Sequence, residues 1–166
     1  MINTIKVKRN AKMIGIDMRT LREPYNVWRN TCTRLSAWMN DAIKNNNLDL
    51  KSYGAGYKFD YKIDKKYWTD KRDSDKVDDD QCTSAELVKY LSAETDVFCE
   101  CDPKTSTQRR DVLNYVAERY YGYKKRNGSK KIPHPTFHED IAWYFKEKFL
   151  TINSKKKTLK IKTLKG

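Results

Sequence analysis

The sequence predicts an α+β fold, with short β-strands near the two ends of the chain and helices between them. Apolar and polar residues alternate over 2–9 and again over 158–163, which is typical of half-buried strands. Between these segments, apolar residues recur every three or four positions along two long stretches, as they do in amphipathic helices. A chain of 166 residues can form one domain or two small lobes.

The first strand is followed by a predicted helix of about 24 residues. Pro24 is tolerated only in a first helical turn, so we expect the helix to begin near Arg22 or Glu23 and to end at residues 45–47, which are all asparagine. Three cations lie off its apolar stripe and should face solvent or phosphate: Arg29, Arg34 and Lys44. The stripe itself consists of Leu21, Tyr25, Trp28, Cys32, Leu35, Met39 and Ala42.

The middle of the chain is harder to interpret. Residues 53–68 alternate aromatic side chains with Lys and Asp, which fits either a hairpin or an irregular aromatic loop. Residues 69–81 are acidic and almost free of large apolar residues, so we expect a flexible linker with solvated carboxylates. Thr83 or Ser84 should then cap a short helix that ends near Thr95.

A second long helix is predicted from Thr105, which has Gln108 three positions later as in a capping box, to about Lys124. It has an apolar face and a cationic side, and a basic run follows it. After a loop that contains Pro133 and Pro135, the alternation over 158–163 places Lys160 and Lys162 on the outer face of a last strand. We expect this strand to pair with the first one.

The net charge of +13 is unevenly distributed. Residues 1–60 hold 11 Lys/Arg against 5 Asp/Glu, residues 61–103 hold 7 against 12, and residues 104–166 hold 17 against 5. This layout favours a polyanion-binding protein with an acidic insert. The eleven tyrosines and four tryptophans could stack on bases, although the core is the favoured place for any single ring.

Four cysteines in a chain without a secretory signal favour reduced thiols over a disulfide framework. A zinc site is the weaker alternative, and its ligands would be Cys99, Cys101, His134 and His138. The same histidines with Glu139 and Asp140 are the only concentrated catalytic candidate, which we interpret as a loop. No apolar run approaches the roughly 18 residues of a membrane helix, so we expect no membrane partner and a cytoplasmic location in a prokaryotic or virus-infected cell.

The order of these parts resembles the N-terminal half of transposon-encoded TnpB proteins and of compact type V CRISPR effectors, over nearly the whole chain. A basic first strand precedes a helix with the segment Tyr25-Asn26-Val27-Trp28-Arg29-Asn30, and a helix from Ser106-Thr107-Gln108 to Tyr120-Tyr121 follows. A Pro135-Thr136-Phe137 element and a strand pair ending in Leu164-Lys165-Gly166 come next. The chain departs from the family at His134, where a glycine is usual, and at Tyr120-Tyr121, where two phenylalanines are usual.

The resemblance implies an oligonucleotide-binding-like β-barrel, the wedge (1–20 and 127–166), interrupted by a helical recognition lobe (21–126). These parts would bind a structured guide RNA, target DNA and the guide–target heteroduplex, in transposition or antiviral defence. The family's RuvC nuclease, which uses Mg²⁺, would have to come from elsewhere, such as another polypeptide or a second copy, because no complete catalytic site is visible here.

The chain would thus be the non-catalytic, nucleic-acid-binding half of an RNA-guided DNA endonuclease. Two alternatives remain: a standalone regulator or inhibitor derived from such a protein, and a DNA-binding repressor. The residues expected to contact nucleic acid are Lys6, Lys8, Arg9, Arg29, Arg34, Arg109, Arg110, Arg119, Tyr123, Lys124, Lys125, Arg126, Lys130, Lys131, Lys160 and Lys162.

Overall fold

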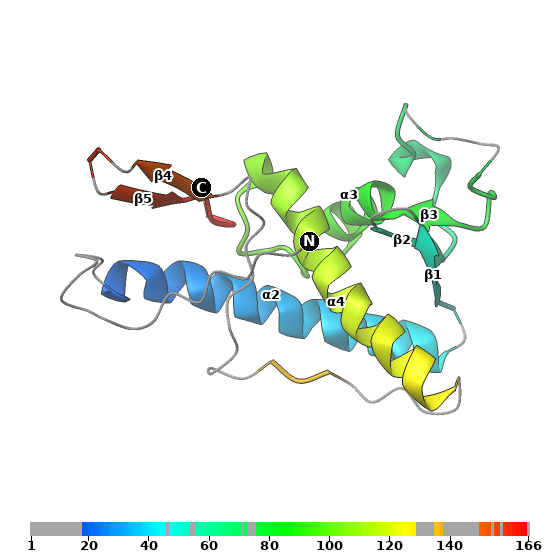
Figure 1. Cartoon of the computed structure of the whole chain (residues 1–166). Coiled ribbons are helices and arrows are strands. Elements are labelled where there is room, and N and C mark those ends of the chain that lie inside the picture. The colour runs from blue at the N-terminus through cyan, green and yellow to red at the C-terminus, as the bar shows by residue number, and fades with distance from the viewer. Residues whose placement is uncertain are drawn as a thin grey trace.

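The structure is a computed structural model that describes residues 18–45, 47–53, 56–70, 72, 76–128, 135–137, 150–153, 155–156 and 158–165. Within these residues the architecture is α+β, with three α-helices and two small antiparallel sheets (Figure 1). The α+β prediction is confirmed at this level. The two sheets do not join into a barrel in the described part of the chain. The predicted strand at residues 2–9 lies outside the described residues, and so does its pairing with the last strand.

Helix α2 (Met18–Lys44) carries the predicted apolar stripe. The stripe is buried from Trp28 to Met39, with Cys32 and Leu35 fully inaccessible to solvent. The predicted start near residue 22 is wrong, because α2 begins at Met18 and Pro24 lies inside the helix. A proline within a helix removes one backbone hydrogen bond and costs about 3 kcal/mol. The packed stripe that follows Pro24 can offset this local loss.

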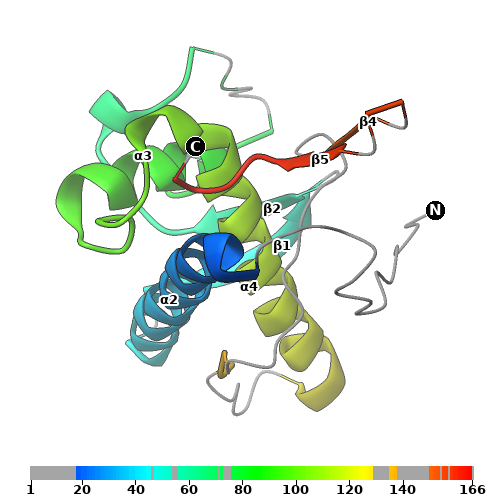
Figure 2. The same ribbon diagram turned by 90° about the vertical axis from the view of Figure 1, so that its left-hand side faces the viewer.

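Helix α4 (Ser106–Asn127) packs against both α2 and α3 (Ser84–Glu94). Figures 1 and 2 show α4 crossing α2, with the C-terminal ends of the two helices diverging in the side view. The core lies where these helices meet. Its fully buried side chains include Leu35 and Met39 of α2, Leu87 and Leu91 of α3, and Leu113, Val116 and Tyr120 of α4.

Residues 49–83 form a three-stranded antiparallel sheet in the order β1 (Asp49–Tyr53), β2 (Gly56–Asp60), β3 (Cys82–Thr83). Phe59 lies opposite Leu50 on one side and Cys82 on the other, and all three side chains are buried. The aromatic segment that the sequence left undecided is therefore a hairpin at its start, followed by a 3-10 turn, η1 (Lys65–Tyr67). The region between residues 21 and 126 thus contains a sheet as well as helices.

The acidic segment 69–81 packs against α3 at its described residues and does not extend freely there as a linker would. Val77 is buried, and the Arg72 guanidinium donates to the Glu86 carboxylate at 2.9 Å inside the protein. Arg72 also donates to the carbonyl oxygens of Asp78 and Gln81. Glu86 completes the predicted cap of α3, because its carboxylate accepts from the Thr83 amide and its own amide donates to the Thr83 hydroxyl.

The last strands, β4 (Leu150–Asn153) and β5 (Thr158–Ile161), pair with each other as an antiparallel hairpin. The segment after β5 is tied to the start of α4, near the 3-10 turn η2 (Pro103–Thr105). The predicted capping box of Thr105 and Gln108 is wrong, since Thr105 makes no side-chain cap. Instead, the Thr105 hydroxyl lies 3.2 Å from the carbonyl oxygen of Leu164, and the Gln108 amide donates to that of Lys162 at 2.8 Å.

Candidate nucleic-acid interface

Several cations of the acidic middle segment are paired with carboxylates. Ion pairs join Lys62 to Asp80 at 3.1 Å, and Lys66 to Glu94 at 3.2 Å. The others in this part of the molecule are Lys51–Asp60, Lys65–Asp79 and the buried Arg72–Glu86 pair. A paired cation offers less charge to an external phosphate than an unpaired one, so this segment is a poor polyanion surface.

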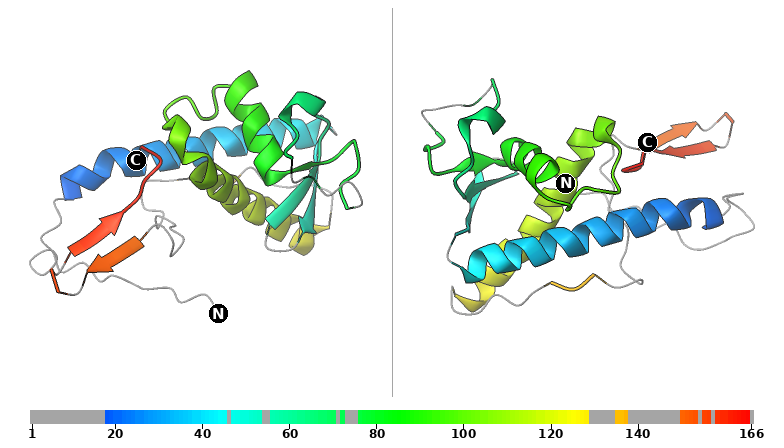
Figure 3. Two further views of the ribbon diagram at one scale, coloured as in Figure 1. Left: turned by 90° about the horizontal axis from the view of Figure 1, so that it is seen from above. Right: turned by 180° about the vertical axis from the view of Figure 1, so that it is seen from behind.

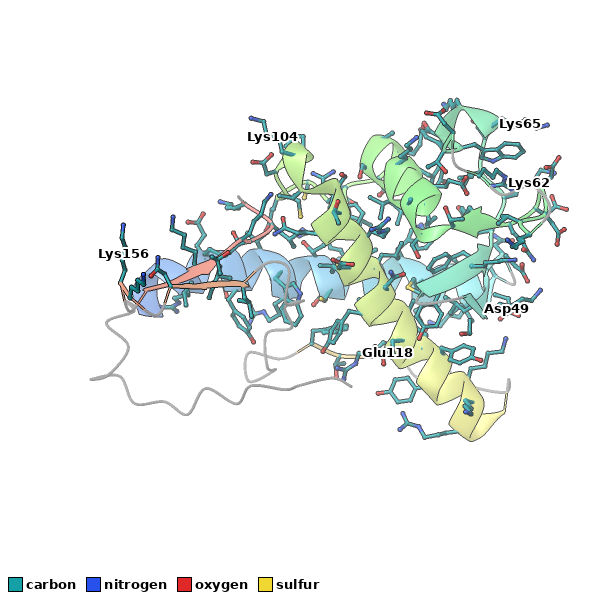
Figure 4. All side chains as sticks on the ribbon, turned by 45° about the horizontal axis from the view of Figure 1, so that its top comes forward. Asp49, Lys62, Lys65, Lys104, Glu118 and Lys156 are labelled. Atoms are coloured by element: carbon teal, nitrogen blue, oxygen red, sulfur yellow. The ribbon has the colours of Figure 1, made fainter. Side chains whose placement is uncertain are left out.

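Exposed cations whose side chains have no hydrogen-bond or ion-pair partner among the described residues gather elsewhere. None of them lies between residues 45 and 103. They are Arg22, Lys44, Lys104, Arg110, Lys125, Arg126, Lys155, Lys156, Lys160 and Lys162. Figure 4 shows Lys104 and Lys156 on one side of α4 and the paired residues Lys62 and Lys65 on the other.

Four of these residues belong to the β4–β5 hairpin and define the hairpin surface: Lys155, Lys156, Lys160 and Lys162. Lys160 lies in β5 with the outward orientation that the sequence predicts, and Lys162 follows the strand. The ties from Thr105 and Gln108 to Leu164 and Lys162 hold this end of the hairpin beside η2 and α4. The hairpin surface therefore has a fixed attachment at its base.

The last turn of α4 forms a second basic group, the helix-end surface, which consists of Tyr123, Lys124, Lys125 and Arg126. The Arg126 guanidinium lies 5.1 Å from the centre of the Tyr123 ring. Lys124 donates to the carboxylate of Asp49 at the start of β1. Burial opposes ionisation of Asp49, but the bonds from Lys124 and from the Leu50 amide prevail and lower the pKa of that carboxyl. Lys124 is therefore partly neutralised, while Lys125 is exposed and unpaired.

The two surfaces lie at opposite ends of α4. A helix of 22 residues is about 33 Å long at 1.5 Å per residue, so roughly 30 Å of helix lies between the base of the hairpin surface and the end of α4. Both views in Figure 3 place the hairpin and the C-terminal end of α4 well apart. The described residues thus present two separate basic surfaces and not one continuous groove.

Several arginines predicted to contact nucleic acid are instead engaged within the fold. Arg109 is 8% exposed, and its guanidinium donates to the Ser92 hydroxyl and the Cys101 carbonyl. Arg34 donates to the Val97 carbonyl and pairs with Glu100 at 3.2 Å. We therefore leave Arg34 and Arg109 out of the candidate interface, whereas Arg110 is exposed as predicted.

Arg119 and Arg29 are half-buried. Arg119 donates to the Tyr115 hydroxyl and lies 5.1 Å from the centre of the Phe137 ring, so it helps to hold the Pro135–Phe137 segment against α4. Arg29 is also engaged in a contact of its own. Five more predicted contacts lie outside the described residues, namely Lys6, Lys8, Arg9, Lys130 and Lys131.

The cysteines do not form a metal site in the described part of the chain. Cys32, Cys82 and Cys101 are buried, and burial raises the pKa of each thiol, whereas Cys99 is exposed. His134 and His138 lie outside the described residues. Among the residues that the structure describes, no group of three or more His, Cys, Asp or Glu side chains could hold a metal ion.

Sequence reasoning missed one aromatic contact beside the helix-end surface. The rings of Tyr57 in β2 and Tyr121 in α4 lie 5.6 Å apart at 57°, and both are half-buried. It also left Lys104, Lys155 and Lys156 out of the predicted contacts. A signal for Lys155 and Lys156 existed, because residues 154–157 carry a lysine run without an acidic neighbour.

No protein family, curated protein or solved structure matches this chain. Within the described residues, no helix is both long enough and apolar enough to cross a lipid bilayer.

Proposed function

We propose that this chain binds the sugar–phosphate backbone of nucleic acid, chiefly structured RNA, without cleaving it. One observation supports this most: ten exposed cations have no hydrogen-bond or ion-pair partner among the described residues, and none of them lies in the acidic middle segment, where Lys62, Lys65 and Lys66 are paired with carboxylates. A solvated lysine without a carboxylate partner can bind phosphate and release condensed counterions.

The number of unpaired cations sets the expected strength of the salt dependence. The hairpin surface supplies four, and Arg110, Lys125 and Arg126 supply three more. Each phosphate contact contributes about −0.7 to the slope of log K against log salt on single strands and about −0.9 on duplexes. Seven contacts would therefore give a slope of about −5 to −6.

The wider proposal follows the resemblance to TnpB and compact type V effectors. In it, the hairpin belongs to a wedge-like, oligonucleotide-binding β-barrel that the first strand completes, and the helices form the recognition lobe. The partners are then a structured guide RNA and target DNA, with the RuvC nuclease and its Mg²⁺ supplied elsewhere. The two basic surfaces suit this role because guide recognition relies on backbone and shape more than on sequence.

The test measures binding of a structured RNA hairpin by fluorescence anisotropy over a series of salt concentrations. Replacing the four lysines of the hairpin surface by alanine should flatten the slope by about three units. The matched control replaces four paired lysines by alanine, Lys51, Lys62, Lys65 and Lys66, and so changes the net charge equally. Its slope should stay close to that of the wild type.

Two results would contradict the proposal. If the wild type binds RNA without salt dependence, or not at all, the backbone-binding function is wrong. If both variants flatten the slope equally, overall charge governs binding and the hairpin surface has no specific role.

A further inference from the structure

The tyrosine pair Tyr57–Tyr121 lies next to the helix-end surface. Tyr121 is three and four positions before Lys124 and Lys125 on α4, so these side chains share one side of the helix. Tyr57 contacts Tyr121 from β2, and Lys124 is held by Asp49 of the neighbouring strand β1. Two aromatic rings and two cations therefore lie near the contact between the sheet and the end of α4.

Both tyrosines retain an unused polar group. Neither hydroxyl has a hydrogen-bond partner among the described residues, and neither is among the buried unsatisfied atoms. Burial of part of the side chain raises the pKa of Tyr57, and the nearby Glu118 carboxylate adds to this. The Tyr57 phenol therefore stays neutral near pH 7 and can donate a hydrogen bond to a ligand.

A second tyrosine pair, Tyr61–Tyr90, has a similar arrangement, but its hydroxyls and rings are engaged within the protein, and we call it the closed pair. Tyr61 and Tyr90 have nearly the same ring geometry, 5.7 Å and 56°, and are also half-buried. Their hydroxyls lie 3.3 Å apart and bond to each other, and each ring also contacts another aromatic residue, Trp38 or Tyr67. No such further ring contact occurs at Tyr57–Tyr121 among the described residues.

We propose that unpaired bases of a single strand stack on the Tyr57–Tyr121 pair while the adjoining phosphates contact Lys125 and Arg126. Aromatic side chains next to cations are the usual combination in single-strand binding, because every base has a π-face. This inference rests on the proposed function and adds its substrate class: RNA with unstacked bases, such as loops and single-stranded ends.

Glu118 determines the direction in which such a strand would lie. It is exposed, one turn before Tyr121 on α4 (Figure 4). Its negative charge repels phosphate from that side of the ring pair, whereas Lys125 attracts phosphate on the other side. The base therefore covers the rings, and the backbone runs towards the end of α4.

The experiment compares three ligands: a 12-nucleotide single-stranded RNA, the same backbone with abasic residues at its centre, and a blunt RNA duplex. The variant Y57L/Y121L keeps apolar packing but removes the rings, and Y57F/Y121F keeps the rings but removes the hydroxyls. Y61L/Y90L is the matched control from the closed pair. Circular dichroism and thermal unfolding check that each variant is folded.

Loss of the rings should weaken binding of the single strand by about 5- to 150-fold, the effect expected for one stacked base. Binding of the abasic strand and of the duplex should change less than about twofold. The Phe variant should retain most of the affinity for the single strand, and the control variant should match the wild type.

The stacking proposal fails if Y57L/Y121L binds the single strand as the wild type does. It also fails if the variant loses affinity for the single strand, the abasic strand and the duplex equally. In both cases salt-dependent binding by the wild type would still support the backbone-binding function. If the wild type binds none of the three ligands, both proposals fail together.

Discussion

The Arg72 guanidinium donates to the Glu86 carboxylate at 2.9 Å, and the two side chains are only 6% and 0% exposed. This buried pair joins the acidic segment to the first turn of α3. Glu86 also accepts from the Thr69 amide and from the Thr83 amide, so its charge is compensated on several sides. Removal of the arginine would leave a buried carboxylate without its cation.

The substitution Arg72→Met should therefore lower the free energy of unfolding by about 3–5 kcal/mol, the usual cost of breaking one side of a buried ion pair. Urea unfolding followed by circular dichroism measures this change. The control is Lys65→Met, whose pair with Asp79 at 3.8 Å is about three-quarters exposed and should matter by less than about 0.5 kcal/mol. Equal effects of the two substitutions would contradict the prediction.

Stability should fall at alkaline pH because of Tyr120. Burial raises the pKa of this phenol to about 12, although its hydrogen bonding to Ser36 acts in the opposite direction. An unfolded tyrosine ionises near pH 10, so between pH 10 and 12 the unfolded state loses a proton that the folded state keeps. The free energy of unfolding should therefore decrease as pH rises through this window.

Unfolding by urea at pH 9, 10 and 11 measures that loss, and Tyr120→Phe should make it smaller. Tyr57 and Tyr61 also have raised pKa values, so part of the pH dependence should remain in the variant. If the wild type and Tyr120→Phe lose stability in parallel, Tyr120 does not contribute to the alkaline transition.

Asp49→Asn should strengthen RNA binding. The carboxylate of Asp49 holds Lys124, and its removal would free this ammonium for phosphate at the helix-end surface. One more phosphate contact should steepen the salt slope by about 0.7 on a single strand. Asp60→Asn is the control, because it frees Lys51 on the outer part of the sheet, and its slope should not change. A steeper slope in both variants would point to net charge alone.

Gln108→Leu should loosen the base of the hairpin without unfolding the protein. It removes the 2.8 Å hydrogen bond to the Lys162 carbonyl, but it also removes a buried amide oxygen that has no partner. We expect little change in the midpoint of thermal unfolding and several-fold faster tryptic cleavage after Lys160 and Lys162. The control is Thr107→Ala, at an exposed neighbouring position, and trypsin should cleave this variant at the wild-type rate.

The helices were largely predictable from the sequence, because they depend on local patterns. The stripe of α2 and the Thr83–Glu86 cap of α3 involve residues a few positions apart. The Arg72–Glu86 pair joins residues 14 positions apart across a segment whose acidic composition suggests solvation. Similarly, the contacts of Thr105 and Gln108 with the C-terminal segment span more than 50 residues and replace a cap that has the same local signature.

The candidate interface was predictable only in part. Local sequence indicates which residues are charged but not which of them find a partner, so Arg34 and Arg109 looked the same as Arg110. The contact between Tyr57 and Tyr121 joins residues 64 positions apart, and no periodicity predicts it. The alternating segment after Tyr53 fits a strand and a loop equally well, because its charged and aromatic residues can alternate in either.

Because the two basic surfaces lie at opposite ends of α4, one nucleic-acid strand can contact the chain at two separate points. In a duplex each nucleotide advances a strand by about 3.4 Å along the helix axis, so roughly nine nucleotides are needed to reach from the base of the hairpin to the end of α4. A shorter oligonucleotide occupies one end at a time. A longer one that is bound at the first surface reaches the second surface in an intramolecular step. The resulting gain in affinity depends on the effective local concentration of the second segment.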